Sequence, residues 1–413
     1  MFTRRDLFKR TLDGATLVAL APTVPVFLAR TARAAGTKPD SRVLVVIQLD
    51  GGNDAINTLV PFRDEGYAKN RKSLRLDEKQ LIKVNGELGL HPGLRQMGKL
   101  LERGQLALVP GVGYPNPNRS HFESMAIWHS ARLDPEEHGG PGWIGRGLDT
   151  QYRAGKEQPA GASSLFVGEG PPPAALRARR AAVTSLDRLD DLVLPEGWAG
   201  KNGKSRAAAM PGGDDLDAYV RRSTLDAYAA SERVTELTSR RTESDARYPG
   251  TALGGRLQTI ARLLEADLSA RVFYTVQGGY DTHAGQSNTH FGLMSELGGA
   301  VKAFLDDLAA AKLADRVIVM GFSEFGRRVA ENSSAGTDHG TAGLVFLAGD
   351  GVKDGVHGKV PSLTDLVDGD PKITTDFRRV YASILDDWLG LPSRQALGPG
   401  FEPLPIFRAA GKA

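Results

Sequence analysis

The segment R-V-L-V-V-I-Q-L-D-G-G-N-D, residues 42–54, decides the fold. The run from Val43 to Leu49 is almost continuously apolar, which predicts a strand buried on both faces of a parallel sheet. Asp50 follows at the carboxyl end of this strand. The two glycines after it allow a positive φ or the close approach of another backbone.

Similar apolar runs alternate with helical patterns along the rest of the chain. Strands are expected at Leu106–Gly111, Val272–Val276, Arg316–Phe322 and Ala342–Ala348, and helices near His91–Arg103, Ser120–Ala131, Leu253–Ala270, Phe291–Ala311 and Thr375–Leu389. This alternation predicts an α/β fold with a doubly wound, mostly parallel sheet. Residues from about 133 to 250 differ, because loops rich in Gly, Pro, Ala and Arg precede one amphipathic helical pattern. We expect this range to be an inserted, loop-rich and helical cap.

The N-terminus has the layout of an export signal. Paired arginines, Arg4 and Arg5, precede an apolar stretch at residues 15–28 and small residues at 32–35. This order is typical of a cleavable signal for the twin-arginine translocase. The apolar stretch contains two prolines and is short for a bilayer span, so a stable transmembrane anchor is not expected. Residues 1–35 are therefore predicted to be the signal, and residues 36–413 a single periplasmic or secreted domain.

Charge and cysteine content exclude several functions. Residues 1–35 carry six Lys/Arg and two Asp, a net charge of +4. The whole chain has a net charge of +3, so the remaining residues have a net charge of −1. Such a balance gives no basic field for nucleic acid. Cysteine is absent, so disulfides, thiolate metal ligands and a nucleophile derived from cysteine are all excluded. Any metal must be bound through oxygen or nitrogen.

Carboxylates and imidazoles follow several of the predicted strands. In a parallel sheet the carboxyl ends of the strands share one edge, so residues distant in sequence can meet there. Oxygen and imidazole nitrogen together suit a divalent transition metal. The candidate metal ligands are Asp50, Asp281, His283, Glu324, Asp338 and His339. For Asp54, a helix cap and a site residue are about equally well supported by the sequence.

Ser120 is the candidate nucleophile, because it follows a strand and opens a predicted helix. Ser120 and Glu123 also match a capping box, and the two roles are compatible. His121 has two equally supported roles, as a ligand or acid–base group and as a surface histidine. Arg327 and Arg328 are candidates to hold an anionic oxygen, although a surface salt bridge is the alternative, favoured for Arg328. The other histidines, expected to be caps or surface residues, are His91, His129, His138, His290 and His357.

Five motifs resemble those of a family of bacterial proteins exported by the twin-arginine route, the domain of unknown function 1501. They are L-D-G-G-N-D, N-R-S-H-F-E-S-M-A-I-W, G-G-Y-D-T-H, F-S-E-F-G-R and T-D-H-G-T-A-G, in this order along nearly the whole mature chain. In outline this family is similar to the alkaline phosphatase and sulfatase superfamily. The resemblance implies an alkaline phosphatase-like fold with a metal centre at the carboxyl edge of the sheet.

By the same resemblance, the candidate residues take specific roles. Asp50 is similar to the first-strand metal aspartate, and Ser120 to the nucleophile at a helix start. Asp281 and His283 look like the ligands of one metal and Glu324 like a ligand of the other, with His339 as the late histidine ligand. Asp338 either orients His339 or is a ligand itself. Phe325 stands where the superfamily usually has a histidine, which implies one metal, or two with an altered shell.

Two functions of different classes follow. The first is an exported hydrolase of phosphate or sulfate esters that depends on one or two divalent ions (Zn, Mn or Ca) and acts on a small anionic ester or glycan. The second is a non-catalytic envelope protein that keeps the fold and binds a metal, an anion or a partner. The residue at position 325 favours the second, and the convergence of the candidate ligands favours the first.

Overall fold

A computed structural model describes residues 42–152, 163–187, 246–266 and 270–408. The predicted export signal, residues 1–35, and most of the predicted cap lie outside these ranges. Within them, a nine-stranded sheet has the order β13-β5-β12-β9-β1-β8-β6-β7, with β16 also paired to β5. Its strands are β1 (Val43–Leu49), β5 (Leu106–Gly113), β6 (Ser163–Val167), β7 (Ala182–Leu186), β8 (Val272–Gln277), β9 (Val317–Phe322), β12 (Gly343–Ala348), β13 (Gly355–Val356) and β16 (Thr375–Asp376).

The sheet is mixed but largely parallel, which confirms the predicted fold class. β1 pairs in parallel with β8 on one side and β9 on the other. β12 is the exception, because it runs antiparallel to both of its neighbours, β9 and β5. Since β5 is therefore parallel to β9, the strands β1, β5, β8 and β9 all end at the same edge.

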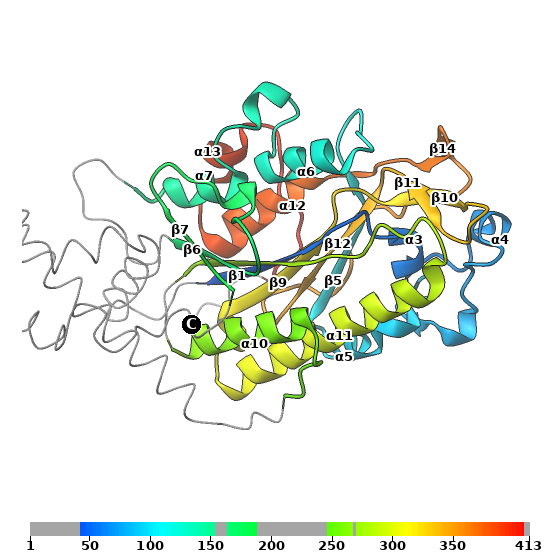
Figure 1. The fold of residues 1–413 in the computed structure, drawn as a ribbon, viewed down its shortest axis with the longest axis horizontal. Helices are drawn as coiled ribbons and strands as arrows, with labels where there is room; N and C mark the ends of the chain where they lie inside the picture. The colour runs from blue at the N-terminus through cyan, green and yellow to red at the C-terminus, as the bar shows by residue number, and fades with distance from the viewer. Residues whose placement is uncertain (1–41, 153–162, 188–245, 267–269, 409–413) are drawn as a thin grey trace, which may run out of the picture.

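Helices cover both faces of the sheet (Figure 1), and the pleat of β1 explains why. Val43, Val45 and Ile47 point into one apolar core, and Leu44 and Val46 point into the other. The first core includes residues of α5 (Arg95–Glu102), α10 (Ala252–Glu265) and α11 (Gln286–Ala310). The second includes residues of α6 (His121–Ser130), α7 (Trp143–Asp149), α12 (Phe377–Ser383) and α13 (Ser393–Leu397). Burial on both faces requires the continuous apolar runs seen in the sequence.

The predicted final helix begins later than expected. Residues 375 and 376 pair with β5 as β16, and the Asp376 side chain then caps α12 by accepting from the Arg378 amide. α12 continues as a π-helical turn, Ile384–Leu389, and ends at Gly390 with φ +63°. The stop at Gly390 is the one predicted from sequence.

Two segments of the predicted cap belong to the central sheet. β6 pairs in parallel with β8, and β7 pairs in parallel with β6. This range was expected to lie over the edge of the sheet as an insertion, but residues 163–167 and 182–186 extend the sheet itself. Residues 153–162 and 188–245 lie outside the described ranges.

Short elements complete the described chain. The hairpin of β10 (Arg327–Glu331) and β11 (Thr337–His339) follows β9 and carries several site residues. The others are α3 (Ala55–Thr58), α4 (Glu65–Asn70), β2 (Leu59–Val60), β3 (Ile82–Lys83), β4 (Gly89–Leu90), β14 (Leu366–Val367) and β15 (Asp370–Pro371). None of the helices in the described part of the chain is both long and apolar enough to cross a membrane.

Asp54 has a structural role: its side chain caps α3 by accepting from the Asn57 amide. The same carboxylate forms an ion pair with Arg71, and both side chains are fully buried. The cap predicted from sequence is therefore present, and it is joined to a buried charge pair.

Candidate metal centre

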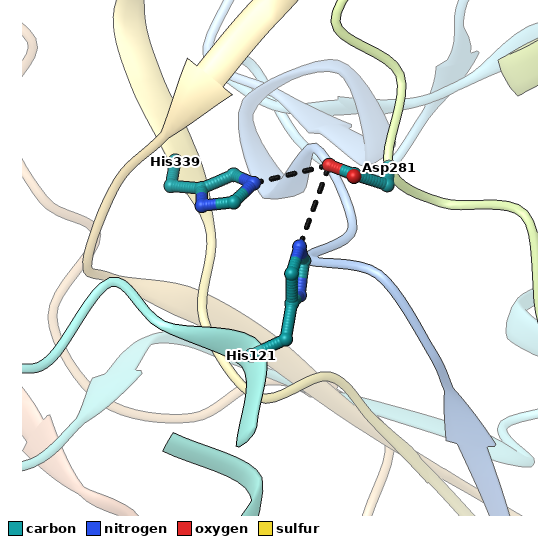
Figure 2. Close-up of side chains that lie close together, drawn as sticks. All are labelled: His121, Asp281 and His339. Carbon is teal, nitrogen blue, oxygen red and sulfur yellow. Dashed lines mark hydrogen bonds and ion pairs between the residues drawn. The ribbon is translucent and has the colours of Figure 1, made fainter. Parts of the chain in front are cut away.

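Side chains from three segments converge at the edge where β1, β5, β8 and β9 end. The loop after β8 supplies Asp281 and His283, the start of α6 supplies His121, and β11 supplies His339. Ligand atoms of His121, Asp281 and His339 all lie within 4.8 Å of one another. Figure 2 shows the two imidazole rings pointing toward the Asp281 carboxylate.

A single oxygen, Asp281 Oδ1, is the centre of this cluster. It lies 3.0 Å from His283 Nε2, 3.0 Å from His339 Nε2 and 3.5 Å from His121 Nε2. The Nε2 atoms of His283 and His339 are themselves 2.9 Å apart. Three imidazole nitrogens and one carboxylate oxygen therefore share a small volume at the sheet edge.

Each imidazole is oriented by an oxygen at its other nitrogen. The Nδ1 atom lies 2.7 Å from Glu324 Oε1 in His121, 3.2 Å from Asp338 Oδ1 in His283, and 2.8 Å from the Arg119 carbonyl oxygen in His339. A carbonyl or carboxylate oxygen can only accept, so each ring can donate to its oxygen in the tautomer that carries the proton at Nδ1. In that tautomer the three Nε2 lone pairs face Asp281, whereas in the other tautomer His339 donates from Nε2 to Asp281 Oδ1.

In the tautomer with protons at Nδ1, the converging Nε2 lone pairs repel one another and favour a bound cation, while the Arg327 guanidinium already donates to Asp281 Oδ1 at 2.8 Å. His121 Nε2 is buried without a hydrogen-bond partner, although it faces Asp281 Oδ1. Histidine ligands of metals commonly donate their second nitrogen to a carboxylate or backbone carbonyl, which is the arrangement of all three rings. Tetrahedral zinc with bonds of about 2.0–2.1 Å needs ligand atoms roughly 3.3 Å apart. Asp281 Oδ1 lies 3.0–3.5 Å from the three Nε2 atoms, and those of His283 and His339 are 2.9 Å apart, which is close to that spacing. The ligand atoms that all lie within 4.8 Å of one another belong to His121, Asp281 and His339.

Glu324, predicted to be a ligand, lies one layer outside the cluster. Its buried carboxylate accepts from the Gly51 amide at 3.0 Å, lies 2.8 Å from Ser323 Oγ and receives His121 Nδ1–H. This hydrogen bond, together with the negative charge of Glu324, raises the pKa of His121. Glu324 thus orients His121 in the cluster.

Asp338 has a similar position behind His283. Its Oδ1 accepts from Asn332 Nδ2 at 3.1 Å and faces His283 Nδ1. The Asn332 hydrogen bond and the nearby His283 lower the pKa of Asp338. The resemblance implied that Asp338 orients His339 or binds metal, whereas the structure pairs it with His283.

Asp50, predicted to be a metal ligand, is directed elsewhere. Its carboxylate accepts from Gln48 Nε2 at 2.9 Å, two residues back on the same face of β1. Gln48 in turn contacts Tyr274 and His129 through its Oε1. Because the pleat places Asp50 on the side of Gln48, its carboxylate joins this neighbouring network.

Arg327 does not clamp a substrate anion, which corrects the sequence-based prediction. Its side chain is 0% exposed, and every guanidinium nitrogen donates to the protein. The acceptors are the carbonyls of Gly51, Gly52, Tyr280 and Thr337 and Asp281 Oδ1. Burial raises the pKa of Asp281, but the hydrogen bonds from Arg327 and His339 outweigh it and bring that pKa to about 2.

Ser120 is exposed at the N-cap of α6, next to the candidate ligand His121. Its side chain makes no cap hydrogen bond, so the capping box expected with Glu123 does not form. The Ser120 amide instead donates to Asn118 Oδ1 at 2.8 Å. Its hydroxyl is thus left free of a cap role at the margin of the cluster.

Phe325 packs against the cluster where the superfamily resemblance implied a histidine. Its ring centroid lies 4.9 Å from those of His121 and His339. A Cβ added to Gly52, which has φ +71°, would be 2.3 Å from Phe325 Cε2. Phe325 therefore fills the space above the glycine loop and holds two imidazoles from the side.

The remaining histidines divide between caps and buried contacts. His91 caps a 3₁₀ turn by accepting from the Gly93 amide, as expected, and is itself buried. His290 is also buried, 3.1 Å from Asn53 Oδ1, so the expectation of a cap or surface position is wrong for it. His129, His138 and His357 contact Gln48, the Arg132 carbonyl and the Lys353 carbonyl, respectively.

Gly51→Ala is expected to destabilise the protein by at least ~2 kcal/mol, because Gly51 has φ +115° and an added Cβ would lie 2.5 Å from the Asp281 amide nitrogen. Urea unfolding at neutral pH measures the change. Gly86→Ala is the matched control, because nothing lies within 4 Å of its added Cβ and it should change stability by less than ~0.5 kcal/mol. Equal stability of the two variants would contradict the close backbone contact.

Solved structures with an overlapping fold are only distantly similar. The lipoteichoic acid synthase LtaP from Listeria monocytogenes is 10% identical, with a TM-score of 0.37 over 84% of this chain and 80% of that one. The PsFucS1 sulfatase from Pseudoalteromonas sp. is 10% identical, with a TM-score of 0.36 over 92% and 73%. The alkaline phosphatase from the Antarctic bacterium TAB5 is 10% identical, with a TM-score of 0.32 over 75% and 92%. Similarity this low says nothing about the chemistry of the present chain.

A comparison with curated proteins finds no match. The family model described as "Protein of unknown function (DUF1501)" matches residues 41–394, which include every residue of the cluster. The chain therefore belongs to the DUF1501 family.

Proposed function

We propose that this protein is an exported, metal-dependent hydrolase of phosphate or sulfate esters. One observation carries the proposal: three imidazoles, each held at Nδ1 by an oxygen, direct their Nε2 atoms at Asp281 Oδ1. This is the arrangement of a preformed metal site with its supporting layer.

His121, Asp281, His283 and His339 would hold the ion. A set of three nitrogens and one oxygen suits zinc or manganese better than calcium, which prefers oxygen ligands throughout. When bound, the ion would supply Lewis-acid polarisation of an ester oxygen. Glu324, Asp338 and the Arg119 carbonyl keep the three rings oriented, and Phe325 packs beside two of them.

Ser120 is proposed as the nucleophile. It stands at the N-terminus of α6, where the helix dipole favours a developing negative charge, and it directly precedes His121. Its exposed position leaves the hydroxyl accessible to a small anionic ester or to the end of a glycan. The arginine pair at positions 4 and 5 supports delivery by the twin-arginine translocase to the periplasm or beyond, as one domain of residues 36–413.

Metal content and turnover test this function together. The protein is purified from the periplasm, its bound metal is measured by elemental analysis, and it is assayed on aryl phosphate monoesters, diesters and sulfates with added Zn²⁺ or Mn²⁺. About one ion per chain is expected in the wild type and in Asp365→Ala, an exposed carboxylate paired with Lys372. Asp281→Ala and His283→Ala should lose the ion, and Ser120→Ala should keep it but lose turnover. A wild type without stoichiometric metal would remove the proposal.

A second function is a non-catalytic envelope protein that retains the metal site. The Phe325 ring, which occupies the position of an expected histidine, supports this alternative. The same assays separate the two functions. Bound metal without turnover on any ester class would favour the binding protein, whereas turnover that disappears in Ser120→Ala would exclude it.

A further inference from the structure

Two arginines next to the cluster share one buried carboxylate. Asp370, on β15, is 1% exposed. Its Oδ2 accepts from both Nε and Nη2 of Arg119, with Nε at 3.0 Å. Its Oδ1 has no hydrogen-bond partner and lies 3.5 Å from Arg328 Nε. Asp370 therefore holds the Arg119 guanidinium by two hydrogen bonds and lies within ion-pair distance of Arg328 on strand β10.

The group consists of two guanidinium charges and one carboxylate, with a second carboxylate, Asp338, near Arg328. One carboxylate faces two guanidinium groups, and the other near contact of Arg328 is a neutral carbonyl, that of Asp368 at 2.6 Å. The side chains of Arg119 and Arg328 are 41% and 38% exposed, so both groups reach solvent. Two guanidinium groups therefore reach solvent here, on side chains held by the buried Asp370 carboxylate and the Asp368 carbonyl. Guanidinium groups held in this way suit an oxyanion.

The arginines are directly connected to the cluster. The Arg119 carbonyl oxygen accepts from His339 Nδ1, and Arg328 follows Arg327, which donates to Asp281. A ligand held by the arginines would thus lie beside the cluster without using the same side chains.

An exposed aromatic ring stands on the same short segment. Phe122 is 88% exposed, although it follows the candidate ligand His121 by one residue and Arg119 by three. Neither burial nor ring stacking explains a phenylalanine at this place. The flat face of a sugar ring, which carries several C–H groups, is a suitable partner for such a ring.

We infer that Arg119, Arg328 and Phe122 form a recognition subsite for a carbohydrate that carries a second sulfate or phosphate group. This inference rests on the proposed function, because it places the scissile ester at the metal cluster and the second anion on the arginines. The substrate class is then a polyanionic glycan.

Binding without turnover tests the subsite. Calorimetry compares a trisulfated disaccharide, its desulfated counterpart and sodium sulfate at low ionic strength. The wild type is expected to prefer the trisulfated sugar, and Arg328→Gln should weaken that binding about tenfold through the loss of a charge-assisted contact. Phe122→Ala should weaken binding of the disaccharide but leave sodium sulfate unaffected. Arg328 is the first choice, because its replacement keeps the Arg119–Asp370 pair that stabilises the fold.

Arg103→Gln is the matched control, because Arg103 is an exposed arginine paired with Asp306 and should bind as the wild type does. Equal affinity of the wild type for sulfated and desulfated sugar, or an unchanged affinity in Arg328→Gln, would overturn the subsite. These results are independent of catalysis. A protein that binds the sulfated sugar but turns over no ester refutes the hydrolase and not the subsite.

Discussion

Arg71→Met should lower the free energy of unfolding by about 3–5 kcal/mol, because it leaves Asp54 as a buried charge without its partner. Both side chains are fully buried, and two guanidinium nitrogens of Arg71 donate to the carboxylate at 2.6 and 3.1 Å. Arg71 also donates to the carbonyl of Val329 at 2.7 Å and that of Arg328 at 2.9 Å. The pair therefore joins the loop after β1 to strand β10, which precedes the site histidine on β11.

Urea unfolding at pH 7 measures this change, with Arg63→Met as control. Arg63 forms an exposed pair with Glu78, for which a loss below about 1 kcal/mol is expected. If Arg71→Met also lowers the free energy of unfolding by less than about 1 kcal/mol, the buried charge of Asp54 is stabilised by other groups.

The same pair makes a prediction for acid pH. Burial raises the pKa of Asp54, but the charge and hydrogen bonds of Arg71 outweigh it, so the pKa falls from 3.8 to about 2. A depressed pKa in the folded state stabilises the protein above pH 3.8, and that stability is lost as the pH falls toward 2. In Arg71→Met the free energy of unfolding should instead rise as the pH falls, because protonation of Asp54 then removes an unpaired buried charge.

The sheet could be predicted from sequence because its strands are buried on both faces. A run such as Val43–Leu49 has only one stable position, between two layers of helices, and its bounds agree with the structure. Strand direction is a different matter. The run at β12 is as apolar as its neighbours, and only the path of the chain through the β10–β11 hairpin makes it antiparallel. β6 and β7 were missed because they are short and lie within a range dominated by loops.

The convergence of several of these side chains was predictable, but their contacts with one another were not. Strand ends share an edge, so Asp281, His283 and His339 could be grouped from their positions along the chain. Which group faces inward depends on hydrogen bonds that sequence does not reveal. Glu324 is turned toward the Gly51 amide and His121, and Asp50 toward Gln48. The one available signal for His121 was its place after Ser120, at the start of a helix that follows a strand.

His121 faces the cluster directly, whereas Glu324 contacts it through His121, and this difference can be tested by metal affinity. His121→Ala should lower the affinity for Zn²⁺ by more than about 100-fold, because it removes a ligand, whereas Glu324→Gln should lower it about tenfold, because it weakens only the support of that ligand. Competition with a chromophoric chelator measures both affinities. His357→Ala is the control, since His357 is half-buried and its Nε2 lies 2.7 Å from the Lys353 carbonyl oxygen.

The ranking of the two variants decides between two arrangements of the site. If Glu324 were a direct ligand, as the family resemblance implied, Glu324→Gln would cost more affinity than His121→Ala. In the structure Glu324 contacts the cluster through His121 Nδ1. Once the His121 ring is removed, a change at position 324 should therefore hardly alter the affinity for Zn²⁺. The double variant is then expected to match His121→Ala within a factor of about three, because two changes in one chain of contacts are not additive. Independent, multiplying losses would instead place the Glu324 carboxylate on the ion itself.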